Sequence, residues 1–164
     1  MTKQTCDQLV FQIGELLIQS HAMLATAESC TGGWIAQQIT ALPGSSNWFD
    51  RGFVTYSNVS KTEMLGVSDQ TIRLRGAVSE QTVCEMAQGA LSNSHADWSL
   101  AVSGVAGPGG GTEENPVGNV WFAWASKEGY LRSELRQLEG DRVDVRGHAV
   151  INALVGLMNS INGE

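Results

Sequence analysis

The segment from residue 44 to residue 61, GSSNWFDRGFVTYSNVSK, combines several hydroxyl groups with a lone lysine and contains no histidine. Ser46, Tyr56 and Lys61 are the side chains in it that could take part in catalysis. A neutral lysine can remove the proton of a serine, and Ser–Lys pairs replace Ser–His pairs in some hydrolases. That role requires a partly buried lysine, whose pKa then falls from about 10.4 toward neutrality. The segment thus holds the parts of an amine-activated nucleophile.

Ordinary structural roles would explain the same residues. A serine in a Gly-Ser-Ser turn is most often a turn residue or a helix N-cap, and most lysines are solvated at the surface. Trp48 and Phe49 leave a similar choice, because they could stack on an aromatic substrate or anchor a core or a subunit contact. The residue types alone leave these alternatives open.

Metal and histidine chemistry have less support in the sequence. His21, His95 and His148 are far apart, and none belongs to an H-x-x-x-H or C-x-x-C arrangement. Surface or hydrogen-bonded histidines are the simpler interpretation. We therefore expect neither a metal site nor a cofactor.

The segment ESCTGG could bind a negatively charged ligand. It leads from a predicted strand into a predicted helix, where free N–H groups favour phosphate or carboxylate. The signal is weak, because the P-loop pattern G-x-x-x-x-G-K-[ST] is absent, and a capped helix with close glycine packing is the alternative. The candidate ligand-binding residues in this segment are Ser29, Thr31, Gly32 and Gly33.

A glycine-rich loop, GVAGPGGGTEENPVG, spans residues 104–118 between two strong strand candidates. Loops of this length are uncommon inside compact domains, and those that occur often bind ligands. The backbone at Gly107, Gly109 and Gly110 could approach a ligand closely, because glycine has no side chain. A flexible connector is the alternative.

Two arginines lie at the expected start of the last helix, in GDRVDVRGHAV. Arg142 and Arg146 are four residues apart and share a helix face, and positive charge at a helix start opposes the macrodipole. A broken local rule of this kind often marks a functional site, so an anionic ligand is expected there. Ion pairs with Asp141 and Asp144 are the alternative.

Helix and strand patterns alternate along the chain, with two strands adjacent near the end. This pattern predicts an α/β fold, a three-layer α/β/α sandwich around a mixed β-sheet, with ligand-binding loops beyond the strand ends. The expected helices lie near residues 5–20, 32–41, 60–65 and 79–93 and at the C-terminus, with apolar spacing at 150–161. The expected strands lie at 23–27, 52–57, 98–102, 120–125 and, as an edge strand, 130–138.

The composition is that of a globular protein and bounds the classes of partner. The 164 residues are enough for one domain, residues 1–164, with a substantial core. A net charge of -7 argues against nucleic-acid binding, and no apolar run is long enough for a membrane span. Three cysteines without a C-x-x-C pair, and an N-terminus unlike a signal peptide, lead us to expect a cytoplasmic protein.

Six motifs together resemble one known family. TAESCTGG, GSSxxFxRGFVTYSNxxK, GAVSE, SGVAGPGGG, NPVGxVWFA and GDRxxVR occur in this order over most of the chain. The set resembles the CinA C-terminal domain family, whose stand-alone members are nicotinamide-nucleotide amidases. The resemblance implies hydrolysis of the carboxamide of nicotinamide mononucleotide, in pyridine-nucleotide salvage, with nicotinic acid mononucleotide and ammonia as products.

The same resemblance implies roles for individual residues. Ser46 is expected to be the nucleophile and Lys61 its base, with Tyr56 helping to move the proton. Ser103, before the glycine-rich loop, and Arg142 are expected to bind the substrate. The phosphate would be held by Arg142, by the ESCTGG helix start or by the glycine-rich loop. Asn115 departs from the lysine that many relatives have at this position, which removes any ligand role of that lysine.

The expected partner is thus a small-molecule substrate, with no nucleic acid and no membrane, and the chain is expected to form a homo-oligomer. Two other functions stay open at this point. One is an amidase for another small nucleotide amide, and the other is a non-catalytic domain that regulates or binds a partner.

Overall fold

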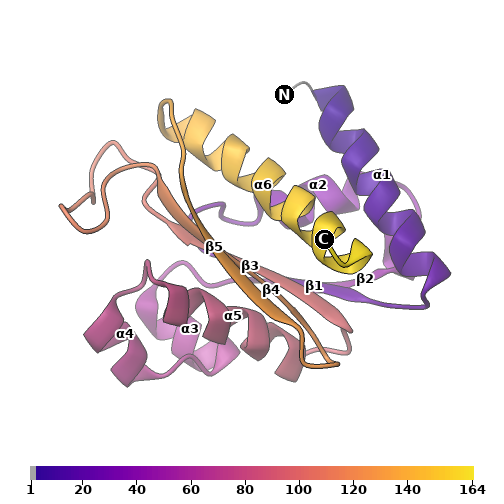
Figure 1. Cartoon of the computed structure of the whole chain (residues 1–164), viewed down its shortest axis with the longest axis horizontal. Helices are drawn as coiled ribbons and strands as arrows, with labels where there is room; N and C mark the ends of the chain where they lie inside the picture. Colours follow the sequence, from indigo (N-terminus) through magenta and orange to yellow (C-terminus); the bar gives the residue numbers. More distant parts are fainter. Residues whose placement is uncertain (1–2) are drawn as a thin grey trace.

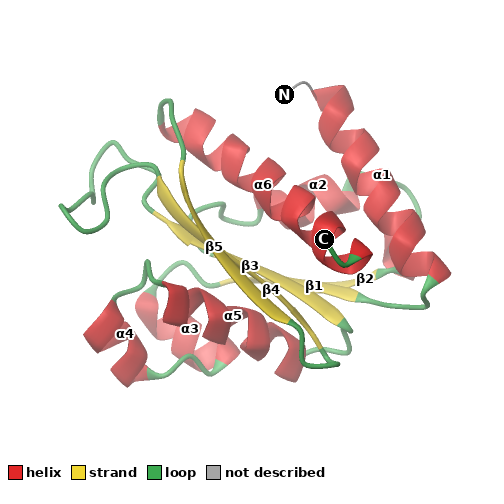
Figure 2. Ribbon diagram, in the orientation of Figure 1, coloured by secondary structure: helices red, strands yellow, loops and turns green. Residues whose placement is uncertain are grey.

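The computed structural model describes residues 3–164, which form a sheet with helices on both faces (Figures 1 and 2). Across the sheet the strand order is β2-β1-β3-β4-β5, and the predicted three-layer α/β/α sandwich with a mixed sheet is confirmed. In chain order the elements are α1 (Lys3–Gln19), β1 (Leu24–Glu28), α2 (Trp34–Thr40), η1 (Ser45–Asn47), β2 (Phe49–Val54), α3 (Asn58–Leu65), α4 (Asp69–Arg75), α5 (Glu80–Ser92), β3 (Trp98–Gly104), β4 (Asn119–Ser126), β5 (Leu131–Gln137) and α6 (Arg142–Asn162).

The two faces of the sheet differ in the size of their side chains. Helices α1, α2 and α6 cover one face, and α3, α4 and α5 cover the other (Figure 1). Side chains alternate along a strand, so Leu100, Val102 and Phe122 pack with the first group of helices. Ala101 and Ala123, from the same two strands, pack with residues of α5. The small residues let α5 lie close to the sheet.

The three parallel strands β1, β2 and β3 have their carboxyl ends at the same end of the sheet. β1 runs parallel to β2 and to β3, with Glu28 opposite Val54 on one side and opposite Val102 on the other. Ser29, Thr55 and Ser103, the residues that come next along the chain, therefore lie side by side. β4 and β5 are antiparallel additions, and the long β3–β4 loop projects from this end of the molecule (Figure 1, left). Ligands of α/β sheets bind beyond such carboxyl ends.

Most elements lie within a few residues of their predicted positions, with two exceptions. β2 was expected at 52–57 but spans Phe49–Val54, because its pairing with β1 runs from Leu24 to Glu28. α4 was not predicted, because it buries none of its residues and so has no apolar periodicity.

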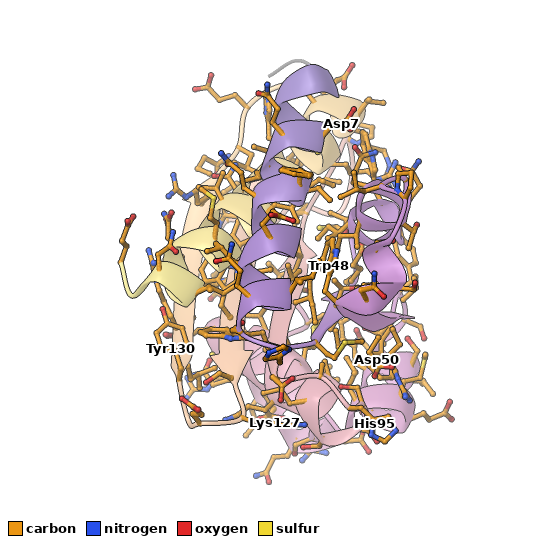
Figure 3. All side chains as sticks on the ribbon, turned by 90° about the vertical axis from the view of Figure 1, so that its right-hand side faces the viewer. Asp7, Trp48, Asp50, His95, Lys127 and Tyr130 are labelled. Atoms are coloured by element: carbon orange, nitrogen blue, oxygen red, sulfur yellow. The ribbon has the colours of Figure 1, made fainter. Side chains whose placement is uncertain are left out.

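Trp48 belongs to the core and not to a ligand site. Its side chain is 1% exposed and packs against α1 at Gly14, where a Cβ would lie 2.8 Å from the indole nitrogen. Figure 3 shows Trp48 next to α1, at the end of the molecule away from the β3–β4 loop. Of the two alternatives for this residue, the core anchor is the one found.

Within residues 3–164, no helix is both long and apolar enough to cross a membrane.

Candidate active site

A buried lysine lies beside a serine where β1 and β2 end. The Nζ atom of Lys61 is 3.1 Å from Ser29 Oγ and 2.8 Å from the carbonyl oxygen of Thr55. Ser29 directly follows β1, and the Lys61 side chain is 1% exposed on the first turns of α3. The Ser57 hydroxyl caps α3 by accepting the Ser60 N–H at 3.1 Å. The start of α3 is thereby fixed, and with it the direction of Lys61.

Burial lowers the pKa of the Lys61 amine below its usual value. A negative charge on Cys30 would act in the opposite direction. However, burial also raises the pKa of the Cys30 thiol to about 11, so this thiol is uncharged at neutral pH. Lys61 therefore has what a general base needs, a larger neutral fraction and an adjacent hydroxyl.

The expected pairing of Ser46 with Lys61 is not found. Ser46 lies in η1, before β2 begins, whereas Lys61 follows the end of β2. A six-residue strand is about 20 Å long, so the two residues lie beyond opposite ends of β2. Ser46 is exposed, and its neighbour Ser45 is the buried serine of this turn. Ser46 and Lys61 are close in sequence, but this does not bring them together in space, because the extended strand β2 lies between them.

Tyr56 and Arg142 meet at the mouth of the site. The Nη2 group of Arg142 donates to the Tyr56 hydroxyl at 3.1 Å, and its Nη1 group donates to the Gly107 carbonyl at 2.7 Å. The Tyr56 side chain is 63% exposed. The Tyr56 hydroxyl thus contacts Arg142. Within residues 3–164, no hydrogen bond joins Tyr56 to Lys61, so the expected proton transfer through Tyr56 has no direct contact to follow. The contact ties the start of α6 to the glycine-rich loop.

Ser103 projects from the end of β3, on the strand next to Ser29. Its side chain is 1% exposed, and its hydroxyl donates to the Ala77 carbonyl at 2.7 Å. A hydroxyl has one proton and two acceptor positions. With the proton directed to Ala77, Ser103 can offer a ligand only acceptor positions.

The start of α2 is not free to bind an anion. The buried Glu28 carboxylate accepts the N–H groups of Gly33, Ile35 and Ala36 at 2.9–3.1 Å, and the Thr31 hydroxyl at 2.6 Å. The Gly32 N–H donates to the Ser29 carbonyl at 3.0 Å. An internal carboxylate thus occupies the place where a phosphate was expected. Thr31 and the two glycines shape the turn after Ser29.

Arg146 also differs from its expected role as a ligand for the substrate. Its Nε and Nη2 groups donate to the carbonyls of Cys30 and Thr31 at 3.0 and 3.1 Å. In the glycine-rich loop, the Gly107 carbonyl is occupied by Arg142. Gly109 and Gly110 do not line the cavity that contains Ser29 and Lys61.

The cavity around Ser29 and Lys61 has a volume of about 270 Å³. Several of the residues that line this cavity were not predicted from the sequence. They belong to the motifs ESC, TYSN, GAVSE and SGVAG, which the sequence analysis had singled out. Within the described part of the chain, no three His, Cys, Asp or Glu residues are placed to hold a metal ion. The cavity is lined by Ser29, Cys30, Tyr56, Asn58, Lys61, Ala77, Val78, Ser103, Gly104, Ala106 and Arg142.

Comparisons with known proteins agree on one family. The family model of the CinA C-terminal domain matches residues 6–161. The nicotinamide-nucleotide amidohydrolase PncC of Escherichia coli K12 is 51% identical over 154 residues, which are 94% of this chain and 93% of that protein. The protein of the same name from Pseudomonas putida is 51% identical over 150 residues, 92% of this chain and 93% of that one.

A solved structure gives the same answer for the fold. The crystal structure of the competence/damage inducible protein CihA from Agrobacterium tumefaciens has a TM-score of 0.92 and 43% identity. The match covers 96% of this chain and 95% of that one. The chain therefore belongs to the CinA C-terminal domain family.

Proposed function

We propose that this chain hydrolyses the carboxamide of nicotinamide mononucleotide, with Ser29 as the nucleophile and Lys61 as its base. The observation that carries the proposal is the buried Lys61 amine 3.1 Å from Ser29 Oγ in a pocket. The substrate comes from the amidohydrolase names of relatives that are 51% identical. The products would be nicotinic acid mononucleotide and ammonia, a step of pyridine-nucleotide salvage.

In the first step, neutral Lys61 takes the proton of Ser29, and Ser29 Oγ bonds to the amide carbon. The Thr55 carbonyl accepts one amine N–H at 2.8 Å, which leaves the nitrogen lone pair for the Ser29 proton. Negative charge develops on the amide oxygen, and backbone N–H groups stabilise such charge effectively. The N–H groups of Cys30 and Thr31 are the donors we assign to this role, because those of Gly32 and Gly33 donate to the Ser29 carbonyl and to Glu28.

In the second step, the Lys61 ammonium returns its proton to the amide nitrogen, and the C–N bond breaks to release ammonia. Water then attacks the nicotinoyl ester on Ser29, again with Lys61 as base. The net reaction consumes one water and releases one ammonia and one carboxylic acid. The pyridinium charge of the substrate makes its carbonyl more electrophilic.

Ser103 is suited to discriminate the amide from the acid. Because its proton is directed to Ala77, it can accept an N–H of the substrate carboxamide. The carboxylate product has no N–H to donate and meets only oxygen lone pairs there. We therefore assign Ser103 to binding of the amide nitrogen, which favours substrate over product.

Arg142 is the side chain we assign to the substrate phosphate, because it is exposed at the mouth and a guanidinium has five N–H donors. Arg142→Ala should raise the KM for the nucleotide about 10- to 100-fold and change kcat little. Nicotinamide riboside, which lacks the phosphate, should be affected much less. Steady-state kinetics with both substrates measure this, and Arg136→Ala on the edge strand β5 is the matched control. Equal effects on the two substrates would exclude the phosphate role.

An ammonia-release assay tests the proposed activity itself. The wild-type protein should release ammonia from nicotinamide mononucleotide much faster than from free nicotinamide, glutamine or asparagine, because only the nucleotide reaches both Ser29 and Arg142. Similar rates with all four amides would reject the nucleotide as the substrate. An absence of ammonia from every amide would favour the non-catalytic alternative.

A further inference from the structure

Arg146 holds the backbone immediately after Ser29. The guanidinium donates to two successive carbonyls, Cys30 O at 3.0 Å and Thr31 O at 3.1 Å. It lies 5.4 Å from the centre of the Trp34 ring, the first residue of α2, in a cation–π contact. Arg146 does not line the cavity that contains Ser29 and Lys61. Its contacts are therefore with the turn and not with the space that a substrate would fill.

These contacts determine which way the peptide groups of the turn face. In a planar trans peptide, the C=O and the following N–H point in opposite directions. With the Cys30 carbonyl directed to Arg146, the Thr31 N–H points away from the guanidinium. On the other side of the turn, the Glu28 carboxylate takes the N–H groups at the start of α2. The turn is thus fixed by an arginine on its carbonyls and a carboxylate on its amides.

The orientation matters because carbonyl and N–H groups have opposite effects on an oxyanion. An N–H directed at the developing negative charge lowers the barrier, whereas a carbonyl in its place would repel the charge. Without Arg146, the Cys30 carbonyl loses its donor, whereas the Thr31 carbonyl keeps the Trp34 N–H at 3.1 Å. The peptide plane between Cys30 and Thr31 is then free to rotate.

We propose that Arg146 is a positioning residue that keeps the peptide between Cys30 and Thr31 turned with the Thr31 N–H available to the oxyanion of the amidase reaction. The inference rests on the proposed function and assigns the two arginines of the α6 start to different tasks. Arg142 binds the substrate phosphate at the mouth, and Arg146 organises the backbone behind the nucleophile. Arg146 should thus act on the chemical step and not on substrate binding.

Kinetics of Arg146→Ala and Arg146→Lys test this separation of roles. Both variants should lose kcat, by about 10²-fold for the alanine variant, because a lysine cannot donate to two carbonyls through a planar fork. KM should stay within about twofold of wild type for the nucleotide and for nicotinamide riboside. Methylguanidinium, but not methylammonium, should restore part of the lost kcat in Arg146→Ala. An unchanged kcat, or a rise in KM for the nucleotide alone, would overturn the proposal.

Covalent labelling of Ser29 separates this inference from the choice of substrate. A fluorophosphonate loses fluoride as Ser29 Oγ bonds to phosphorus, and its oxyanion needs the same N–H donors. Labelling, followed by intact mass, should be markedly slower in Arg146→Ala than in wild type when the two proteins have equal melting temperatures. Methylguanidinium should restore part of the lost labelling rate. Equal labelling rates would overturn the role of Arg146. If the wild-type protein is labelled at Ser29 but releases no ammonia from the nucleotide, the proposed substrate fails while the labelling rates still decide the role of Arg146.

Discussion

Ser29→Ala is expected to reduce ammonia release from nicotinamide mononucleotide by on the order of 10⁴-fold or more, because the Oγ atom that bonds to the substrate is lost. The fold should persist, since the change removes one oxygen and Lys61 keeps its hydrogen bond to the Thr55 carbonyl. Ammonia release measured at saturating substrate, beside thermal denaturation of both proteins, gives the comparison.

Ser46→Ala is the matched control for this variant. Ser46 lies in η1 on the far side of β2 from Lys61 and is exposed, so its removal should leave turnover near the wild-type rate. A covalent nicotinoyl adduct, trapped by acid quenching, should map to the peptide that contains Ser29. Full activity in Ser29→Ala, together with loss of activity in Ser46→Ala, would refute the assignment.

Lys61→Met is expected to lower kcat by at least about 10³-fold, because the base for Ser29 is removed. Methionine keeps an unbranched stem of similar length, which suits a side chain that is 1% exposed. In the wild-type protein, kcat/KM should rise with pH as Lys61 loses its proton, with a midpoint below about 10.4, since burial lowers the pKa of Lys61. A rise that begins only above this ordinary lysine range would contradict the assignment.

The same burial makes the stability of the fold depend on pH in a defined direction. At pH values between the lowered pKa of folded Lys61 and about 10.4, the unfolded chain binds more protons than the folded one. The free energy of unfolding should therefore increase across this range in the wild-type protein by more than in Lys61→Met. Urea denaturation of both proteins near pH 7 and near pH 10 measures the difference, and parallel curves would show that the amine is not desolvated.

The sequence was sufficient to predict the layers of the fold and five of the eleven residues that line the pocket. Apolar spacing located the helices, and motifs singled out Lys61, Tyr56, Ser103 and Arg142, which meet in one cavity. Ser29 and not Ser46 is the serine in contact with Lys61, although Ser46 is nearer along the chain. A stricter use of sheet geometry would have favoured Ser29, since parallel strands bring together the residues that follow each strand.

Other features depend on contacts between distant segments and have no local signal. Nothing in a single lysine or glutamate indicates burial, yet Lys61 and Glu28 are each 1% exposed. Backbone groups supply the hydrogen bonds of both buried side chains. Lys61 donates to the Thr55 carbonyl, and Glu28 accepts the first N–H groups of α2. Likewise, Arg142 and Arg146 look equivalent in the motif. Their different contacts follow from the packing of α6, which places Arg142 on the glycine-rich loop and Arg146 on the turn after Ser29.

The carboxylate of Glu28 at the start of α2 has a consequence for selectivity in the crowded solution of a cell. Inorganic phosphate and the many phosphorylated metabolites would compete for any exposed helix start, but here that position already carries a negative charge of its own. The anionic end of the ligand is then attracted by the solvent-facing guanidinium of Arg142, and this attraction weakens as ionic strength rises. An occupant would thus be chosen by its uncharged end, deep in the cavity, more than by the charge it presents to solvent.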